Sequence, residues 1–154
     1  MQAINYLQFG GNADEAIRFY EKVLQATTTK KVKFGVLEDN PAAPMKEEEK
    51  KMIMESSLEF LGNKIMISDI PPFMQKTIGD LSIGNTLIVS LIDGEPEIYQ
   101  QYFKGLSLEG KVIMPLTEVP WSSCFGIVMD KFGVIWKLNS DASQFLSSFE
   151  EKSK

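Results

Sequence analysis

The apolar and polar positions at the start of the chain predict a strand followed by a helix. Residues 3–9 form a short apolar and aromatic run that ends in two glycines, which is typical of a strand that leads into a turn. Asn12 and Glu15 then have the spacing of a capping box, and apolar residues recur with a helical period between residues 16 and 24. The pattern therefore predicts a strand, a turn and an amphipathic helix that begins at Asn12.

Three strand-like runs follow this helix. Residues 27–36 are rich in β-branched side chains, and the runs 51–60 and 64–70 are separated by a Leu-Gly-Asn turn that predicts a hairpin. Residues 38–50 contain two prolines and three consecutive glutamates, so this segment is too polar and too broken by proline to be core. We expect an exposed, mobile loop there.

The second half of the chain repeats this order after a connecting segment at residues 71–82. An apolar strand at 85–92 leads into a helix that begins near Pro96 and that Gly105 or Gly110 can end. The remaining elements are three strands at 111–116, 122–130 and 134–139 and a final amphipathic helix at 140–152, with Ser140 or Asp141 as its cap.

The two halves are also similar in sequence. Residues 61–67 parallel residues 132–138, which indicates an internal duplication. Halves of roughly 70 residues cannot each bury a good core alone, so we expect them to pair, within the chain or across a dimer. We predict a single domain over residues 1–154. Its parts are a first module at about 1–70, a linker at 71–82, a second module at about 83–139 and the C-terminal helix at 140–152.

The composition narrows the chemistry. None of the 154 residues is histidine, so the commonest general base and the commonest transition-metal ligand are missing. The net charge of -5, without a basic stripe, argues against nucleic acid and membrane surfaces as partners. No apolar stretch approaches the ~20 residues of a membrane-spanning helix. The single cysteine and a start without the features of a signal peptide lead us to expect a cytoplasmic protein.

Motifs along nearly the whole chain resemble those of one known family. In the first half they are the run Tyr6-Leu7-Gln8-Phe9-Gly10-Gly11-Asn12, then Glu15-Ala16, Phe19-Tyr20 and Ile67-Ser68-Asp69. In the second half they are Gly110-Lys111-Val112, Met114-Pro115-Leu116, Trp121, Phe125-Gly126, Asp130-Lys131-Phe132-Gly133-Val134 and Trp136. With these motifs the chain resembles the vicinal oxygen chelate superfamily of glyoxalase, bleomycin-resistance and dioxygenase proteins, and within it the PhnB-like branch.

The resemblance implies a fold and a quaternary structure. The fold is α+β, with paired βαβββ modules of the glyoxalase/bleomycin resistance type whose curved, mostly antiparallel sheets surround a cleft, and here with a C-terminal helix added. Such proteins are usually homodimers, and we expect a homodimer here.

The resemblance also implies where a metal site would lie, and the residues at those positions fit it poorly. Family enzymes bind a metal through His, Gln or Glu on inward strands. The matching positions here are Ile4 or Asn5, Thr86 or Leu87, Lys137, and Glu55 in place of a histidine of PhnB-like members. A lysine ammonium repels a divalent cation and offers no lone pair until it is deprotonated. We therefore expect no metal and no cofactor.

Glu55 is the main candidate for a catalytic residue. The resemblance directs it into the cleft, where burial against methionine and aromatic side chains would suit a general acid or base. The alternative is that simple alternation puts Glu55 with Ile53, Ser57 and Glu59 on a solvated strand face. Both interpretations stay open.

The aromatic and methionine side chains also allow two interpretations. Trp121, Phe125 and Trp136, with Met54 and Met66, could line a pocket for a small apolar or planar ligand, or could be core packing. Cys124 has no histidine to take its proton, so we expect a buried structural thiol.

Three functions remain at this point. The first is a metal-free protein that binds or sequesters a small molecule, and the second is a lyase- or isomerase-like enzyme with Glu55 as base and with or without a metal. The third is a dimeric structural or regulatory partner. Part of this family has been labelled a demethylubiquinone methyltransferase, but the chain has no glycine-rich strand-to-helix turn followed by a ribose-binding acid. We therefore reject methyl transfer.

Overall fold

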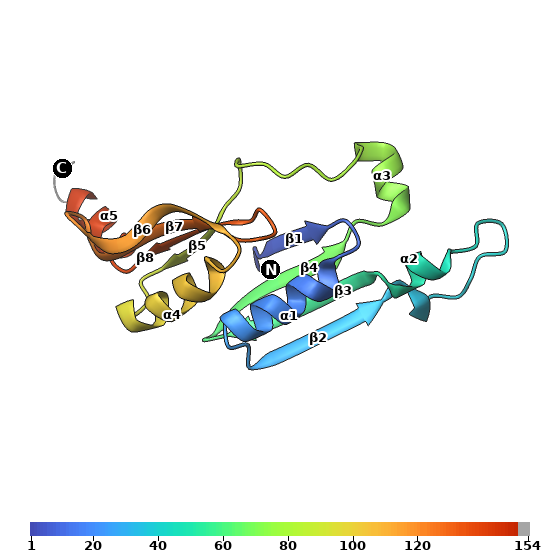
Figure 1. The fold of residues 1–154 in the computed structure, drawn as a ribbon, viewed down its shortest axis with the longest axis horizontal. Helices are drawn as coiled ribbons and strands as arrows, with labels where there is room; N and C mark the ends of the chain where they lie inside the picture. The colour runs from blue at the N-terminus through green and yellow to red at the C-terminus, as the bar shows by residue number, and fades with distance from the viewer. Residues whose placement is uncertain (151–154) are drawn as a thin grey trace. The chain divides into compact units, whose positions relative to one another are not determined.

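The computed structural model describes residues 1–150, apart from the side chains of Pro72 and Glu150. The chain divides into two compact units, the first at residues 1–82 and the second from residue 83 onward. Each unit contains one mixed four-stranded sheet with the βαβββ order (Figure 1). The predicted α+β fold with two such sheets and a C-terminal helix is thus confirmed. Residues 151–152 of the predicted final helix lie outside the described residues.

The first unit follows the predicted order of elements. Its strands and main helix are β1 (Asn5–Phe9), α1 (Ala13–Val23), β2 (Thr28–Lys33), β3 (Ile53–Phe60) and β4 (Asn63–Asp69). The strand order is β1-β4-β3-β2, in which β1 runs parallel to β4 and the other neighbours are antiparallel. The predicted hairpin of β3 and β4 turns at Leu61 and Gly62, both with positive φ, as tight hairpin turns require.

The core of the first unit lies between α1 and one face of its sheet. On the helix side Ala16, Ile17 and Tyr20 are completely buried, and the sheet supplies Leu58 and Ile67. Each fully buried aliphatic side chain of this size contributes about 1.5–3 kcal/mol relative to leaving it exposed. The other face of the sheet carries no helix of this unit (Figure 1).

The start of α1 differs from the predicted capping box. The Asn12 side chain makes no capping hydrogen bond. Instead Oδ1 of Asp69, at the end of β4, accepts hydrogen bonds from the backbone N–H groups of Gly11 at 2.8 Å and Ala13 at 3.0 Å. Its Oδ2 accepts from the Ile53 N–H at 2.8 Å. The cap comes from a strand that is far away in sequence, because β1 and β4 are neighbours in the sheet.

Three segments predicted without helices contain short ones. Within the expected loop at 38–50, the glutamate run forms α2 (Glu47–Lys51), where acidic residues in the first turn and lysines in the last favour a helix. A short 3-10 turn, η1 (Phe34–Val36), replaces the predicted end of β2, so that strand is shorter than expected. The connecting segment contains α3 (Pro72–Ile78), with proline at its first position.

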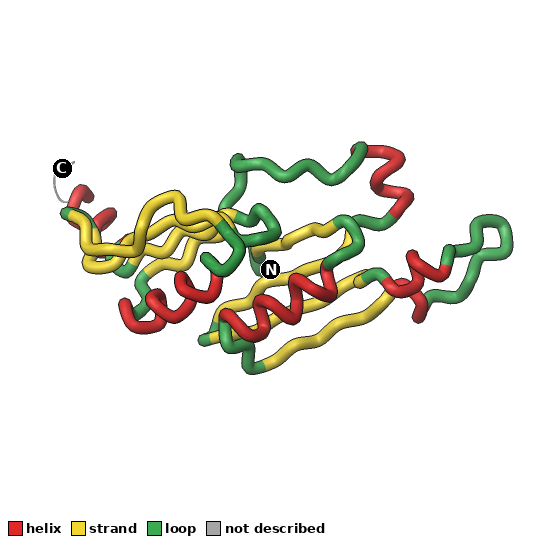
Figure 2. The backbone as a smooth tube through the Cα atoms, viewed as in Figure 1, coloured by secondary structure: helices red, strands yellow, loops and turns green. Residues whose placement is uncertain are grey.

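The second unit repeats the architecture of the first. Its elements are β5 (Val89–Ile92), α4 (Pro96–Leu106), β6 (Lys111–Val119), β7 (Ser122–Met129), β8 (Ile135–Asn139) and α5 (Ala142–Glu150). The strand order is β5-β8-β7-β6, and again only the first pair is parallel. Strand β5 is shorter than the predicted 85–92 because the segment from α3 to β5 is an extended loop (Figure 2).

Strand β6 is longer than predicted, and α4 ends differently. Because β6 lies at the edge of the sheet and is irregularly paired, it can include Pro115 without losing a central hydrogen bond. Helix α4 continues through Gly105 and is capped by Ser107, so Gly105 does not end it. A Cβ on Gly110 would lie 2.5 Å from the Met129 carbonyl oxygen, which makes glycine necessary for this close approach.

The cap of α5 also differs from the prediction. The Asp141 side chain bonds Ser122 and Ser123 instead of the helix. The carboxylate of Asp93, from the turn after β5, accepts hydrogen bonds from the Ser143 N–H at 2.9 Å and from the Ser143 hydroxyl. Asp93 therefore satisfies an N–H in the first turn of α5.

Within residues 1–150, no helix is both long and apolar enough to span a membrane.

Candidate functional site

The helix-free face of the first sheet carries the predicted residues Glu55 and Met66. Because side chains alternate along a strand and paired residues share a face, Tyr6 lies beside Met66, and Ser57 lies on the other side of Met66. Glu55 is two residues before Ser57 and shares its face. We call Tyr6, Glu55, Ser57, Met66 and Ser68 the first-sheet cluster.

A β-bulge changes which residues accompany Glu55. The pairing of β2 with β3 shifts at Val32 and Lys33, which leaves Met54 as the extra residue of β3. Ile53 is therefore completely buried on the core face, with Ser56, Leu58 and Phe60, while Glu55 stays half-buried on the helix-free face. The expectation that Ile53 shares the face of Glu55 is wrong, because the bulge reverses the alternation.

A hydrogen bond connects Glu55 to β1. The Tyr6 hydroxyl reaches across β4 and donates to Oε1 of Glu55 at 2.8 Å. Burial raises the pKa of Tyr6 above its ordinary value; the nearby Ser68 hydroxyl lowers it, and the Glu55 carboxylate raises it. The net pKa is raised, so Tyr6 stays protonated at neutral pH and acts as a hydrogen-bond donor.

The three aromatic residues predicted for a pocket have different environments in the second unit. Trp136 is completely buried on the helix-covered face, where its Nε1–H donates to Oδ2 of Asp130 at 2.9 Å. Phe125 is 9% exposed and packs edge-to-face with Trp121, with ring centroids 5.8 Å apart. Trp121 itself is 39% exposed. Cys124 is buried, and burial raises the pKa of its thiol, as befits a structural cysteine.

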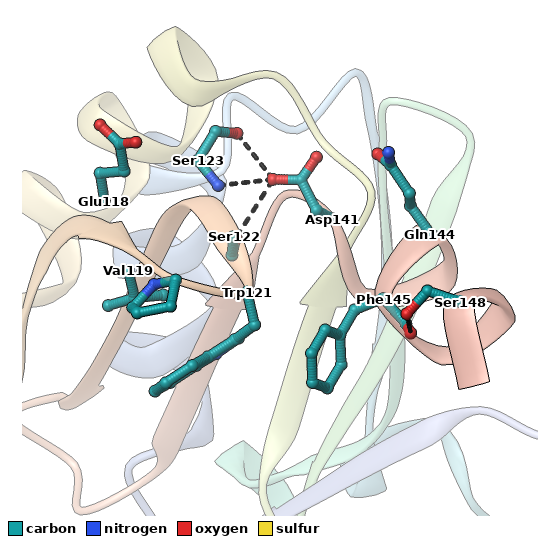
Figure 3. A pocket seen from close by; sticks show the side chains of 10 residues that line it. Glu118, Val119, Trp121, Ser122, Ser123, Asp141, Gln144, Phe145 and Ser148 are labelled. Carbon is teal, nitrogen blue, oxygen red and sulfur yellow. Dashed lines mark hydrogen bonds between the residues drawn. The ribbon is translucent and has the colours of Figure 1, made fainter. Parts of the chain in front are cut away.

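Trp121 also lines a surface pocket of about 380 Å³ between the β6–β7 turn and α5. Figure 3 shows the Trp121 ring on the hairpin side and the Phe145 ring on the α5 side, with Asp141 above them. Oδ2 of Asp141 accepts hydrogen bonds from the Ser123 N–H at 2.6 Å and the Ser123 hydroxyl at 2.7 Å. These two bonds hold the pKa of Asp141 below its ordinary value.

The donors that the structure offers do not fit the metal site of the family. In the described part of the chain, no three Asp, Glu, Cys or His side chains gather around a common point. Lys137, at the position of the family glutamate, lies on the helix-free face of the second sheet beside Ser90 and Ile127. A structural zinc site needs about four N or S ligands and a catalytic one about three, which Glu55 alone does not supply.

The sequence alone did not identify the residues that accompany Glu55 in the first-sheet cluster and Trp121 in the surface pocket. Tyr6 is 49 residues from Glu55, and the signal that could have found it is the parallel pairing of the first and last strands of a βαβββ module. Asp141 was expected as a helix cap, and Phe145 falls within the predicted amphipathic helix at 140–152. Their place in a pocket depends on how α5 packs against the β6–β7 turn, which local sequence does not encode.

Comparisons with known proteins agree with this architecture. Over residues 3–138 the chain matches the Glyoxalase/Bleomycin resistance protein/Dioxygenase superfamily. It is 30% identical over 140 residues to Protein YjdN of Escherichia coli (strain K12), which covers 87% of this chain and 91% of YjdN.

Two solved structures show the same fold. Protein PA1353 from Pseudomonas aeruginosa is 29% identical, with a TM-score of 0.72 over 90% of this chain and 96% of PA1353. A PhnB protein from Bacillus cereus is 22% identical, with a TM-score of 0.64 over 90% of this chain and 98% of that protein. The resemblance seen in the sequence is confirmed: the chain belongs to the glyoxalase/bleomycin resistance/dioxygenase superfamily, the vicinal oxygen chelate proteins, with a PhnB-like structural neighbour and YjdN as a homologue.

Proposed function

We propose that the protein binds a small apolar or planar molecule on the helix-free face of its first sheet, without a metal. The observation that carries this proposal is the hydrogen bond from Tyr6 to Glu55 across β4. A carboxylate held by a tyrosine beside a methionine combines a polar anchor with an apolar surface, which is the usual composition of a small-molecule site.

The first-sheet cluster favours a ligand with a hydrogen-bond donor. Glu55 accepts one bond from Tyr6 through Oε1, and a carboxylate has capacity for several more. Met66 is half-buried next to Tyr6 and offers a polarizable thioether to a flat ring. An N–H or O–H group on the edge of a planar ligand would thus find an acceptor while its ring lies on Met66.

One observation also favours a second function, a lyase- or isomerase-like enzyme with Glu55 as general base. The Tyr6 hydroxyl donates to Glu55, so the Glu55 carboxylate is the acceptor of this hydrogen bond. A general base must likewise accept a proton from its substrate. Tyr6 would then orient the carboxylate. In this scheme Glu55 takes a proton from a carbon acid and returns it at another position or to a leaving group.

One set of variants separates the two functions. A library of planar fragments would be screened by ligand-observed NMR against the wild-type protein, Glu55→Gln and Tyr6→Phe. Glu59→Gln is the matched control, because Glu59 lies on the same face but is paired with Lys64 at 3.1 Å. A binding protein loses affinity in Glu55→Gln and Tyr6→Phe and keeps it in the control. An enzyme keeps ligand binding in Glu55→Gln but loses turnover. Equal binding by all four proteins would contradict a site at this cluster.

The metal-free part of the proposal has its own test. Elemental analysis of protein purified without chelator and without an added affinity tag, followed by calorimetric titration with manganese, nickel and zinc, should find no stoichiometric metal and no binding heat. Stoichiometric metal would overturn this part and would direct attention to the oxygen ligands around Glu55.

We also propose a homodimer, as the resemblance implies. Several large apolar side chains between α3 and the end of β5 are exposed in the single chain, among them Ile83, Leu87 and Ile92. Apolar surface of this kind favours association with a second copy. Sedimentation equilibrium should give twice the monomer mass, and a monomer at high concentration would refute the proposal.

A further inference from the structure

We propose that the pocket between the β6–β7 turn and α5 binds a small organic cation that carries a flat apolar group. This site lies within the second unit alone, so it is separate from the first-sheet cluster and does not depend on the function proposed there.

The pocket has two aromatic walls, each of which contacts a further aromatic ring. Trp121 packs edge-to-face against the buried Phe125, and Phe145 makes a similar contact with the half-exposed Phe149 at 5.1 Å between ring centroids. Both Trp121 and Phe145 are nevertheless 39% exposed, so part of each ring faces the hollow (Figure 3). Because Trp121 packs on a buried ring, it loses little conformational freedom when a ligand packs on it.

The polar part of the pocket is acidic. Oδ2 of Asp141 accepts the hydrogen bonds from Ser122 and Ser123, whereas Oδ1 accepts none from the residues that the structure describes. Glu118 is exposed at the rim, with no hydrogen bond or ion pair to any residue between 1 and 150. None of the ten residues that line the pocket is a lysine or arginine.

These features select a positively charged ligand. Aromatic faces attract cations, and the face of tryptophan does so most strongly. The carboxylates of Asp141 and Glu118 also attract a cation, and no lysine or arginine in the pocket lining opposes them. A flat group on the ligand can pack between Trp121 and Phe145 while its charge faces Asp141 and Glu118. The volume of about 380 Å³ lies at the lower end of the range for small-molecule sites, so the ligand is small.

The experiment uses three probes of similar shape and different charge. They are 1-methylquinolinium, which is a cation, 1-methylnaphthalene, which is neutral, and 1-naphthoate, which is an anion. Isothermal titration calorimetry with the full-length protein should give the tightest binding for the cation, weaker binding for the neutral probe and none for the anion. Binding of the cation should weaken in high salt.

Variants assign the binding to this pocket. Phe145→Ala should weaken the cation by about three- to tenfold through loss of one wall, and Glu118→Gln by about two- to threefold through loss of one charge. Glu118 has no structural partner among the described residues, so Glu118→Gln tests the charge without risk to the fold. The matched controls are Leu146→Ala, on α5 but outside the pocket lining, and Glu95→Gln, also outside the pocket.

Each outcome decides the proposal. Cation binding that is weakened in Phe145→Ala and in Glu118→Gln but unchanged in both controls supports it. No cation binding at millimolar concentration, equal binding of cation and anion, or cation binding that both pocket variants leave unchanged would each overturn it. None of these results involves Tyr6 or Glu55, so they are distinguishable from a failure of the first-sheet site.

Discussion

The two sheets carry different chemistry at the same strand position. In the first sheet Ser57 pairs with Met66, and in the second Ile127 pairs with Lys137. Two residues before each pair stand Glu55 and Phe125. Glu55 is half-buried and bonded to Tyr6, whereas Phe125 is buried against Trp121. The same strand geometry thus carries a carboxylate bonded to a tyrosine on one helix-free face and a pair of aromatic rings at the matching position of the other.

The helix-covered faces of the two sheets are more alike than the helix-free faces. Ile65 and Ile67 of β4 correspond to Trp136 and Leu138 of β8, and all four are buried. Each unit also buries one aspartate that accepts three hydrogen bonds, Asp69 in the first and Asp130 in the second. At these matching positions both units place apolar side chains, and each buried carboxylate accepts several hydrogen bonds, as expected because unpaired buried polar groups are costly.

The largest expected effect comes from removing these buried aspartates. Asp69→Ala leaves the N–H groups of Gly11, Ala13 and Ile53 without their acceptor, and should lower the free energy of unfolding by about 3 kcal/mol or more. Asp130→Ala removes the acceptor of Trp136 and of two backbone N–H groups and should cost a similar amount. Urea denaturation of the full chain measures both.

The control for this pair is Asp80→Ala, because Asp80 is exposed and has no hydrogen bond or ion pair within residues 1–150. Its unfolding free energy should change by less than about 0.5 kcal/mol. If only one of the two substitutions lowers the free energy of unfolding, the two units do not both depend on a buried aspartate.

The next effect tests a difference in packing between the units. Ser57 of the first sheet corresponds to Ile127 of the second, so the preceding residues, Ser56 and Gly126, also correspond. Ser56 has room for a side chain and bonds the Ile67 carbonyl at 2.6 Å, whereas a Cβ on Gly126 would lie 2.9 Å from Cα of Leu116. Gly126→Ala should therefore destabilise the protein by about 2 kcal/mol.

The matched change is Gly84→Ala, since a Cβ on Gly84 meets nothing within 4 Å. Thermal or urea unfolding should show little change or a slight gain, because alanine restricts the unfolded chain. A tolerated Gly126→Ala would mean that the second unit is no more tightly packed at this position than the first.

The smallest effect is a loosening of α5 in acid. Bonds from Ser143 hold the pKa of Asp93 below its ordinary value of 3.8, and bonds from Ser123 do the same for Asp141. Because both folded pKa values are lower than the unfolded ones, the stabilisation is present above about pH 4 and is lost as the pH falls through the folded values. The amide proton shifts of Ser123 and Ser143, followed by NMR, should report this.

The first unit provides the comparison for this titration. The ion pair with Lys31 holds the pKa of Asp14 below its ordinary value too, but Asp14 lies on α1 and supports no terminal helix. Asp93→Asn should remove part of the acid response of Ser143 and leave α1 unaffected. A response of Ser123 and Ser143 that already begins near neutral pH would contradict the assignment to these carboxylates.

The elements that the sequence predicted well are those with a strong local period. Apolar spacing and turn residues predict helices α1 and α4 and the hairpin of β3 and β4. These signals lie within each segment and do not depend on what the segment packs against. The short helices α2 and α3 were missed, because glutamates and prolines that look like a loop also favour the first turn of a helix.

The candidate sites were predicted less completely than the fold. Glu55 and Trp121 were singled out from the sequence, but Tyr6, Asp141 and Phe145 were not recognised as their partners. The bulge at Met54, which moves Ile53 into the core and leaves Glu55 outside it, has no local sign in a run of eight strand residues.

The sequence by itself determined the duplicated order of elements, the buried faces and the family, because hydrophobic period and turn chemistry act between residues close in the chain. The tertiary structure decided which residues meet across long separations. Tyr6 reaches Glu55 over 49 residues, Asp69 caps α1 over 56 to 58 residues, and Asp93 caps α5 over 50. Such contacts form only when strands pair and helices pack, so their chemistry depends on the folded arrangement rather than on any one segment.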